Sequence, residues 1–317
     1  MYKGQRIGLV IPAYNEEENI EAVLRGLPSF IDVLMVINDG SADNTESIAR
    51  NNGAEVINHK KNKGVGATFN TGVKMMLQKE IDIMVNMDAD GQFNSDDIYK
   101  LLDPITEGKA DFVTASRFKD KTLIPVMSPV KLWGNKRMTS FISWLTGEKF
   151  HDVSCGFRAY SKETLNRMNL FGTFTYTQET FIDLAFKGMT IVEVPVKVLG
   201  KRSIGKSRVA SNIPKYAFQT LKIILRTFRD YKPFKLFGFI SLALAVLGLI
   251  FLSVMFYSKI ATGSFTPYKW SGMAAGVLFL SSFIFLLTGF ILDMFARMRH
   301  NQEEILYYLK NNHGKDQ

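Results

Sequence analysis

The sequence is poor in cysteine, because Cys155 is the single one in 317 residues. A chain with one cysteine cannot form an intrachain disulfide framework, and this composition suits a reducing compartment. No His and Asn signature of a cysteine nucleophile accompanies Cys155, so we expect it to be a packing residue. The chain has no internal repeat and no low-complexity segment. Its first apolar run, "RIGLVIPAYN", is too short for a signal peptide and lacks a cleavage site.

Two long runs lack charge altogether. Residues 236–258 and 270–292 contain no Asp, Glu, Lys or Arg, and each run exceeds the roughly 20 residues that a helix needs to cross a bilayer. We therefore predict two transmembrane spans at about these positions. The alternative is an apolar core helix of a soluble domain, which would be unusual at this length without one charged residue.

Acidic residues are scarce in the C-terminal part of the chain. The first 196 residues contain 22 Lys and Arg against 25 Asp and Glu, whereas the remainder contains 17 against 5. The basic residues flank the two uncharged runs, and only Lys259 and Lys269 lie between them. The positive-inside rule therefore predicts that both termini are cytoplasmic, with a short loop outside. Charge at this location favours anionic lipid headgroups or a phosphorylated ligand as the partner and argues against nucleic acid.

Strand-like apolar runs alternate with helical patterns over the first 200 residues. Strands are predicted over 7–11, where Pro12 ends the first one, and over 32–38, 54–58, 81–85, 111–116, 153–161 and 189–199. Helices are predicted over 15–27, 41–53, 64–78, 94–108, 131–145 and 177–188. This alternation predicts an α/β fold, with a mostly parallel sheet covered by helices on both faces.

The chain divides into three predicted parts. Residues 1–211 form a cytoplasmic α/β domain, residues 212–233 a basic amphipathic helix, and residues 234–317 a transmembrane hairpin with a cytoplasmic C-terminal tail. The helix separates an apolar face from a basic one directly before the first span. We expect it to lie in the membrane interface, and a plain surface helix is the alternative.

Two carboxylates follow the predicted strand that ends near residue 85. Asp88 and Asp90, in "MVNMDADGQF", are two residues apart and face the same way on an extended chain, toward the crevice where open α/β sheets bind ligands. Gln92 adds an amide oxygen. Mg²⁺ takes such oxygens and completes its shell with phosphate, so the motif predicts a metal platform for a diphosphate. A solvated acidic turn is the alternative.

Two earlier strand ends carry polar motifs that we expect to converge on the same crevice. "PAYNE" follows the first strand and "NDGS" the second. Asp39 could accept from a base N–H or a ribose hydroxyl, and Gly64 and Gly66 could approach a phosphate at a helix start. Phe69 occupies the third glycine position of a dinucleotide fingerprint, which makes a dehydrogenase unlikely in this fold.

Five ordered motifs, "PAYNE", "NDGS", "NKGVGA", "DADGQ" and "SRF", resemble those of family 2 glycosyltransferases, which are nucleotide-sugar-dependent and have the Rossmann-like GT-A fold. With "DVSCGFRAYS", "RSIGKSR" and the two spans, nearly the whole chain is similar to polyprenyl-phosphate glycosyltransferases of the dolichyl-phosphate mannose synthase and bactoprenol glucosyltransferase type. The motif Gln-x-x-Arg-Trp of processive polysaccharide synthases is absent, which disfavours a polymerase.

The resemblance implies a role for each matching residue. The base and ribose would be held by Pro12, Tyr14, Glu16 and Asp39, and the metal and diphosphate by Asp88, Asp90 and Gln92. The acceptor phosphate would be lined by Arg117, Lys131, Asn135 and Arg202, and the donor sugar would lie near Asp152 and Glu179. The chain departs from the family at Asn38, where Asp is usual, and at Lys131 and Asn135, where Arg and Ser are frequent.

The chemistry of such a reaction agrees with these residue types. A lipid monophosphate has a second pKa of about 6, so it is largely a dianion at neutral pH and needs no general base. The site must instead neutralise charge, with Mg²⁺ or Mn²⁺ at the departing diphosphate and with Arg117, Arg202 and Lys206 at the incoming phosphate. We predict inverting transfer of a hexose-type sugar from a UDP- or GDP-linked donor to a polyprenyl phosphate.

Other functions compatible with the sequence are a non-catalytic nucleotide-binding scaffold on a membrane hairpin, a subunit of a glycolipid transporter, and transfer to another membrane acceptor. The scaffold would bind nucleotide without consuming a nucleotide sugar. The transporter would need a polar path that two uncharged spans do not offer, although a homo-oligomer could assemble one.

Overall fold

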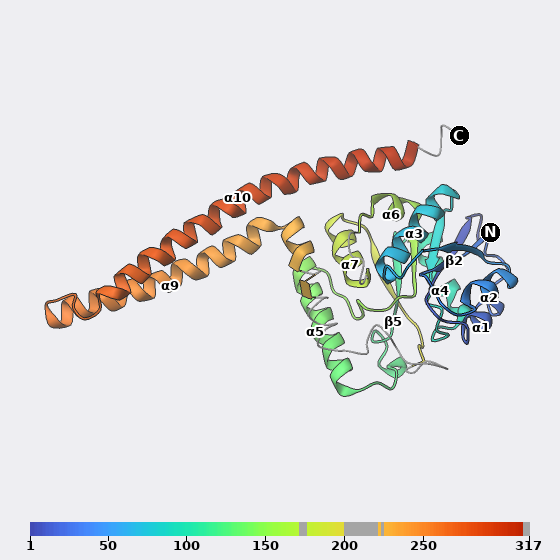
Figure 1. Ribbon diagram of the computed structural model, residues 1–317, viewed down its shortest axis with the longest axis horizontal. Helices are drawn as coiled ribbons and strands as arrows, with labels where there is room; N and C mark the ends of the chain where they lie inside the picture. Colours follow the sequence, from blue (N-terminus) through green and yellow to red (C-terminus); the bar gives the residue numbers. More distant parts are fainter. Residues whose placement is uncertain (171–175, 200–220, 223–224, 313–317) are drawn as a thin grey trace. The chain divides into compact units, whose positions relative to one another are not determined.

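A computed structural model describes residues 1–170, 176–199, 221–222 and 225–312 of the chain. The chain forms two compact units, which we describe separately. Met1–Ile224 and Leu306–Gln317 make the first unit, and Leu225–Ile305 make the second. The first unit contains the sheet and its helices, and the second contains most of the two long helices α9 and α10 (Figure 1).

The sheet of the first unit has seven strands in the order β3-β2-β1-β4-β6-β5-β7. All neighbouring pairs are parallel except the two pairs that β6 makes, with β4 and with β5. The predicted mostly parallel sheet is therefore confirmed. Its strands are β1 (Ile7–Ala13), β2 (Val33–Asn38), β3 (Glu55–Asn58), β4 (Ile83–Asn86), β5 (Phe112–Ser116), β6 (Arg158–Ser161) and β7 (Ile191–Pro195).

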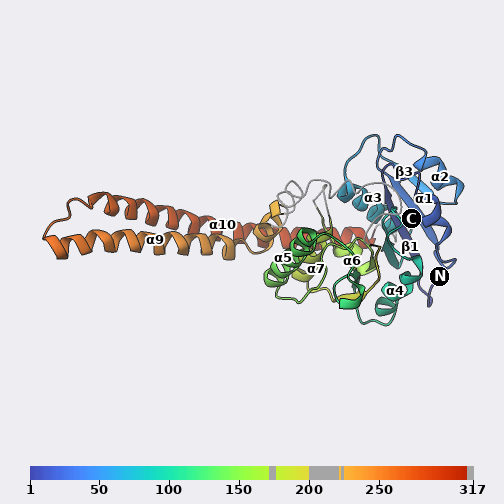
Figure 2. The same ribbon diagram turned by 90° about the horizontal axis from the view of Figure 1, so that it is seen from below.

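Helices cover both faces of this sheet (Figure 2). They are α1 (Ile20–Arg25), α2 (Thr45–Asn51), α3 (Val65–Gln78), α4 (Ile98–Thr106), α5 (Pro129–Thr146), α6 (Lys162–Arg167) and α7 (Thr177–Phe186), with short 3₁₀ turns at η1 (Ser95–Asp97) and η2 (Lys121–Leu123). Ile7, Leu9 and Ile11 of β1 join the core cluster that α1, α2 and α4 complete. On the other face Val10 packs on α3, where a Cβ on Gly72 would come within 2.5 Å of its Cγ1 atom.

Strand β1 runs further than the sequence predicts. Pro12 does not end it, because the strand continues to Ala13 and Pro12 is in register with Ile37 of β2. The Val10 carbonyl accepts from the backbone N–H of Met87, which follows β4, and the Ala13 carbonyl accepts from the N–H of Asp39, which follows β2. Even-numbered residues of β1 therefore direct their backbone polar groups toward β4, and odd-numbered residues direct theirs toward β2. The β1–β4 ladder ends at Val10, so the missing N–H of Pro12 removes no ladder hydrogen bond.

The second unit is built around a helical hairpin. Helices α9 (Pro233–Thr262) and α10 (Lys269–Asn312) are both long and apolar enough to span a membrane, as predicted. Small residues bring them close: Ser241 and Ser282 hydrogen-bond at 3.0 Å, and Gly248 lies against the ring of Phe279. The predicted domain boundary at residue 211 lies outside the described residues. Of the predicted amphipathic helix 212–233, the structure describes residues 221–222 and 225–233, and residues 225–231 are helical.

The end of α10 belongs to the first unit and contacts α6. The Tyr307 hydroxyl donates to the Glu163 carboxylate at 2.8 Å, and the Arg167 guanidinium lies 4.5 Å from the Tyr307 ring centre. The Lys310 ammonium donates to the carbonyls of Asn166 and Met168, both at 3.1 Å. A cation on the last carbonyls of a helix satisfies groups that the helix itself leaves unpaired.

Candidate active site

The acidic motif follows β4, and a small cluster beneath it positions Asp88. The Asn86 amide donates to the Gly156 carbonyl at 2.9 Å and to the Tyr176 hydroxyl at 2.7 Å. A Cβ on Gly156 would lie only 2.7 Å from Oδ2 of Asp88, so the carboxylate can occupy its place only above a glycine. Burial, and to a lesser extent the negative charge of Asp88, raises the pKa of Tyr176 well above its ordinary value.

The second half of the motif is a tight, hydrogen-bonded turn. Asp90 is buried, and its Oδ1 atom accepts from the Gln92 backbone N–H at 3.1 Å. The Gln92 amide nitrogen donates to the Leu199 carbonyl at 2.6 Å, and the Leu199 N–H donates back to the Gln92 carbonyl at 3.0 Å. Gln92, predicted as a metal ligand, therefore also ties the acidic motif to the segment that follows β7.

A divalent cation fits Asp88 and Asp90 only as an open platform. Among the described residues no group of three or more His, Cys, Asp or Glu side chains could hold a metal ion. An ion on these two carboxylates would have to complete its shell with oxygens of water and diphosphate, which is how Mg²⁺ usually binds in phosphate-handling sites.

The predicted convergence of the first two strand ends is confirmed. The Asn15 N–H donates to the Ser41 hydroxyl at 2.9 Å, and the Ala42 N–H donates to the Asn15 side chain at 2.8 Å. The Glu16 N–H donates to the Thr45 hydroxyl at 2.8 Å. "PAYNE" and "NDGS" thus form one hydrogen-bonded rim at the carboxyl edge of the sheet.

The predicted base- and ribose-binding residues of "PAYNE" differ in accessibility. Pro12 and Tyr14 are half-buried. Glu16 is buried, and its Oε2 atom accepts from the Asn19 amide at 3.0 Å, one helical turn on. Pro12 and Tyr14 are therefore better placed than Glu16 to contact a nucleotide, and the buried Glu16 carboxylate contributes to the start of α1.

Asp39, which we expect to accept from a base N–H or a ribose hydroxyl, also shapes the loop before α3. Asp39 is buried: Oδ1 lies 2.7 Å from His59 Nδ1 and accepts from the Lys63 N–H at 3.0 Å, and Oδ2 accepts from the Gly64 N–H at 2.8 Å. A carboxylate has about four acceptor sites, so these three contacts leave one for a further donor. The contact with a base or ribose stays a prediction.

This arrangement also changes the role of Gly64. Its N–H is taken by Asp39, so the predicted approach to a phosphate cannot use that donor. Gly64 has a φ of 92°, which favours glycine and lets the chain turn into α3. His59, which sequence reasoning missed, links Asp39 to α3, because its Nδ1 atom contacts Asp39 and its Nε2 atom lies 2.9 Å from the Thr71 hydroxyl. Its position directly after β3 was the available signal.

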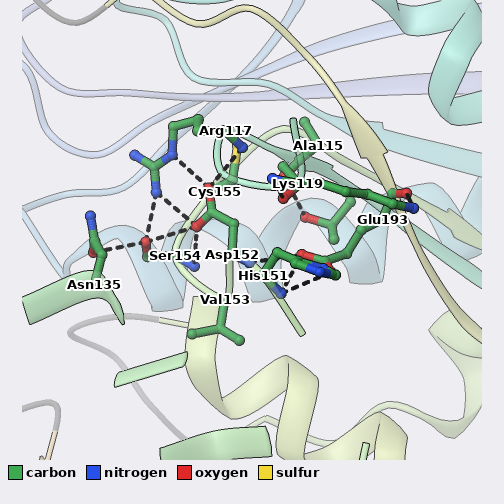
Figure 3. Close-up of polar contacts among 12 residues, drawn as sticks. Ala115, Arg117, Lys119, Asn135, His151, Asp152, Val153, Ser154, Cys155 and Glu193 are labelled. Atoms are coloured by element: carbon green, nitrogen blue, oxygen red, sulfur yellow. Dashed lines mark hydrogen bonds and ion pairs between the residues drawn. The ribbon is translucent and has the colours of Figure 1, made fainter. Parts of the chain in front are cut away.

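Arg117 and Asp152 form the central ion pair of the other half of the site (Figure 3). Asp152 is fully buried, and it accepts from Arg117 Nε at 2.6 Å, from Arg117 Nη2 at 2.8 Å and from the Arg117 backbone N–H at 3.1 Å. Burial alone would raise the pKa of the Asp152 carboxyl, but the charge and hydrogen bonds of Arg117 outweigh it and hold that pKa below its ordinary value. The pair is therefore ionic at neutral pH.

The same geometry bears on the predicted contact of Asp152 with a donor sugar. The Asp152 carboxylate is enclosed and bound to Arg117, whereas the Arg117 side chain remains 18% exposed. Asp152 holds Arg117 in place, and its contact with a donor sugar stays a prediction.

Ser154 connects Arg117 to α5. Its hydroxyl accepts from Arg117 Nη2 at 2.7 Å and lies 3.2 Å from the Asn135 side-chain oxygen (Figure 3). Asn135, predicted at the acceptor phosphate, is therefore linked to Arg117 through the Ser154 hydroxyl. Lys131, one helical turn earlier, is exposed. The two further predicted phosphate-binding residues, Arg202 and Lys206, lie outside the described residues.

The buried carboxylate of Glu193, on β7, hydrogen-bonds the backbone of Asp152 and so helps to fix the Arg117–Asp152 ion pair. Glu193 accepts from the Asp152 N–H at 2.7 Å, from the His151 N–H at 2.9 Å and makes a 2.7 Å contact with His151 Nδ1. The Lys119 ammonium donates to the Glu193 carbonyl at 2.6 Å. Sequence reasoning missed Glu193, although an acidic residue within the apolar strand "IVEVPV" was a visible irregularity.

The two remaining residues of interest are Glu179 and Cys155. Glu179 lies in the first turn of α7 and is buried. Cys155 is also buried, and burial raises the pKa of its thiol to about 12, so it stays a neutral thiol and cannot act as a nucleophile at ordinary pH. This agrees with the predicted packing role.

Comparison with known proteins gives a consistent family. A family model described as "Glycosyl transferase family 2" matches residues 9–168. The chain is 34% identical over 215 residues to the UDP-N-acetylglucosamine–dolichyl-phosphate N-acetylglucosaminyltransferase of Methanococcus voltae, covering 61% of this chain and 85% of that protein. It is 28% identical over 230 residues to the polyprenol monophosphomannose synthase of Mycolicibacterium smegmatis, covering 68% and 85%.

A solved structure shows the same fold. The glucosyl-3-phosphoglycerate synthase of Mycobacterium tuberculosis, crystallised with Mn²⁺, UDP-glucose and phosphoglyceric acid, superposes with a TM-score of 0.57 at 21% identity and covers 71% of this chain and 80% of that one. The hydrogen-bonded rim at the strand ends, the acidic motif after β4 and these matches lead to one conclusion. The chain belongs to glycosyl transferase family 2, and it is a glycosyltransferase with a GT-A catalytic domain.

Proposed function

We propose that this enzyme transfers a hexose-type sugar from a UDP- or GDP-linked donor to a polyprenyl phosphate, with inversion at the anomeric carbon and with Mg²⁺ or Mn²⁺ as cofactor. Two similar proteins are named for transfer to dolichyl phosphate and for synthesis of a polyprenol monophosphate mannose. The candidate spans α9 and α10 support a membrane-bound acceptor. By the positive-inside rule, the catalytic domain and both termini are cytoplasmic.

The observation that carries the proposal is the way Arg117 is held. Its Nε and Nη2 atoms are bound by the buried Asp152, and Ser154 adds a further contact to Nη2. A guanidinium fixed in this way is pre-organised for a phosphate, because little side-chain freedom remains to be lost when the ligand binds. Arg117 follows β5, and only β6 separates β5 from β4, the strand that the acidic motif follows. This position suits an acceptor that brings its own negative charge.

The residues around the acidic motif and Arg117 would have different roles in the transfer reaction. When bound, the cation on Asp88 and Asp90 supplies positive charge for the departing nucleoside diphosphate. Arg117 orients the acceptor phosphate, and Asp152 keeps Arg117 in place. One phosphate oxygen forms the new bond to the anomeric carbon while the bond from that carbon to the donor's diphosphate breaks. Attack from the side opposite the leaving group inverts the carbon, and no general base is required since the acceptor is already ionised.

The test is a product assay with the full-length protein in detergent. It would be incubated with a panel of nucleotide sugars, a divalent metal and a short polyprenyl phosphate, and a labelled lipid product is expected with one donor. Arg117→Ala should abolish transfer while nucleotide binding persists, and Lys121→Ala, which removes an exposed cation outside the site, should leave both unchanged. Nucleotide binding without consumption of any donor would favour the scaffold instead, and full activity of Arg117→Ala would refute the assigned role.

A further inference from the structure

A buried arginine lies opposite the end of β4, the strand that leads into the acidic motif. Arg158 is the first residue of β6 and is fully buried. It is in register with Asn86 in the antiparallel pair of β4 and β6, so the two side chains lie on the same face of the sheet. Within the described part of the chain, no carboxylate forms an ion pair with Arg158. A buried charge without a partner of opposite sign is costly, so an apolar side chain would be the ordinary occupant of this position.

Aromatic rings surround the Arg158 guanidinium in place of an acid. Its central carbon lies 5.1 Å from the ring centre of Phe181, 5.5 Å from that of Tyr176 and 5.6 Å from that of Phe112. Cation–π contacts of this kind offset part of the cost of burial. They use the faces of the rings, so the N–H groups of the guanidinium stay available for the backbone.

These N–H groups join two separate segments of the chain. Arg158 Nε donates to the Cys155 carbonyl at 2.7 Å, in the loop before β6, and Nη2 donates to the Thr177 carbonyl at 3.0 Å, at the first residue of α7. A longer contact of 3.4 Å joins Nη2 to the Val153 carbonyl. We call Arg158 with the carbonyls of Cys155 and Thr177 the Arg158 clamp. A lysine has one ammonium group and cannot reproduce a planar fork that reaches both segments.

The loop on one side of the Arg158 clamp carries the residues that orient two charged groups of the site. Asp152 and Ser154 hold the Arg117 guanidinium, and Asp88 packs closely on Gly156. A shift of this loop would therefore move the cation and the acidic motif together.

The start of α7, on the other side of the Arg158 clamp, is also attached to the site. Tyr176 directly precedes the helix, and its hydroxyl accepts from the Asn86 amide at 2.7 Å. Glu179, predicted near the donor sugar, lies in the first turn of the helix. The start of α7 is thus fixed to the end of β4, and the Arg158 clamp fixes the loop 152–156 to the start of α7.

We propose that Arg158 is a positioning residue, which holds the loop 152–156 against the start of α7 and so keeps Arg117 and Asp88 in the geometry that transfer requires. Its effect on transfer rests on the proposed function. The hydrogen bonds of the Arg158 clamp, and the rings around it, explain why an arginine occupies a buried position that offers no acid.

The single cysteine of the chain tests the Arg158 clamp without turnover. Cys155 is buried, so a thiol reagent reaches it only when the loop opens. In the full-length protein in detergent, well below its melting temperature, Arg158→Met and Arg158→Lys should raise the rate of Cys155 labelling by N-ethylmaleimide about tenfold or more. Arg167→Met is the matched control, because it removes a guanidinium that lies on the ring of Tyr307, away from the loop. Its labelling rate should equal that of the unmodified sequence.

Kinetics separate positioning from a purely structural role. Both Arg158 variants should lower kcat about 100-fold at saturating donor, with the nucleotide dissociation constant unchanged. A purely structural role would weaken nucleotide binding and transfer together, and that result would overturn the proposal. Faster labelling with an unchanged kcat would overturn it too.

The lysine variant decides whether the fork or the charge matters. Arg158→Lys keeps a buried positive charge, so ordinary labelling and ordinary kcat in this variant would show that charge alone suffices and would overturn the Arg158 clamp. The same variant carries the test if Arg158→Met does not fold. Labelling needs neither donor nor acceptor, so failure of the Arg158 clamp and failure of the proposed function are distinguishable.

Discussion

Two buried acids, Asp39 after β2 and Asp152 before β6, have different partners. Asp39 accepts from the backbone N–H groups of Lys63 and Gly64 and contacts His59, so it fixes the course of a loop. Asp152 binds the side chain of Arg117 and so fixes the direction of one cation.

Asp39 therefore fixes the shape of a backbone loop, whereas Asp152 fixes the position of a positive charge. Under the proposed function, the nucleotide half would need a rim of defined shape, and a carboxylate that accepts from consecutive backbone N–H groups provides one. The acceptor half would need a positive charge at a defined point, and a bidentate ion pair provides that. Loss of Asp39 should therefore affect binding of the nucleotide, and loss of Asp152 should affect the rate of transfer. Two of the four variants below test this division, and the other two test the packing around Asp88 and the contact of α10 with α6; they run from the largest expected effect to the smallest.

Asp152→Asn should have the largest effect. The amide cannot hold the Arg117 guanidinium by two charged contacts, and a displacement of about 1 Å at a reacting group can lower a rate about 100-fold. We expect kcat to fall by about that factor while the nucleotide dissociation constant stays unchanged, as measured by turnover and by calorimetry. Ser154→Ala, which retains the ion pair, is the milder matched variant. Unchanged kcat in Asp152→Asn would show that the division is wrong.

Gly156→Ala should have the next largest effect. It tests Asp88, a third acid, whose position depends on close packing against Gly156. The added Cβ would lie 2.7 Å from Oδ2 of Asp88 and 3.0 Å from Oδ1, so the carboxylate must move. We expect the metal concentration for half-maximal rate to rise between about 10-fold and 100-fold. Gly134→Ala is the matched control because a Cβ there meets nothing within 4 Å. Equal metal dependence in both variants would remove Gly156 from the site.

Asp39→Asn should weaken the nucleotide half alone. Its amide group would face the Lys63 or Gly64 N–H with a donor in place of an acceptor, and a lost hydrogen bond to a charged group costs about 1.5–3 kcal/mol. We expect the nucleotide dissociation constant to rise about tenfold, with kcat at saturating donor preserved. Thr71→Val, which alters only the far side of His59, should do less. A fall in kcat without weaker binding would contradict the assignment.

Tyr307→Phe should have the smallest effect, on stability. It removes the hydroxyl that donates to Glu163 of α6, the helix that follows β6 in the acceptor half. A net hydrogen bond contributes about 1 kcal/mol, so the melting temperature of the catalytic unit should fall by a few degrees. Tyr308→Phe, at the exposed neighbouring position, should leave it unchanged. Identical melting of the two variants would mean that the Tyr307–Glu163 hydrogen bond adds nothing to the stability of this unit.

Much of the architecture could be read from the sequence because it depends on local patterns. The apolar runs that became β1 to β5 alternate with helical segments, and the two uncharged runs lie within α9 and α10. The ends of parallel strands meet at one edge of a sheet, so the convergence of "PAYNE" and "NDGS" followed without coordinates. The antiparallel direction of β6 did not follow, since a strand's apolar pattern is the same in either direction.

The sequence by itself determined which residue types stand at the strand ends and which helices are apolar, because backbone periodicity and charge are properties of neighbouring residues. Only the tertiary structure decided what those side chains touch. Asp152 lies 35 residues from Arg117, and Glu193 lies 41 residues from Asp152, and the packing of β5 and β7 brings them together. A buried carboxylate is stable only with donors around it. The donors to Asp39 and Asp152 come from distant parts of the chain, so neither motif by itself could predict them.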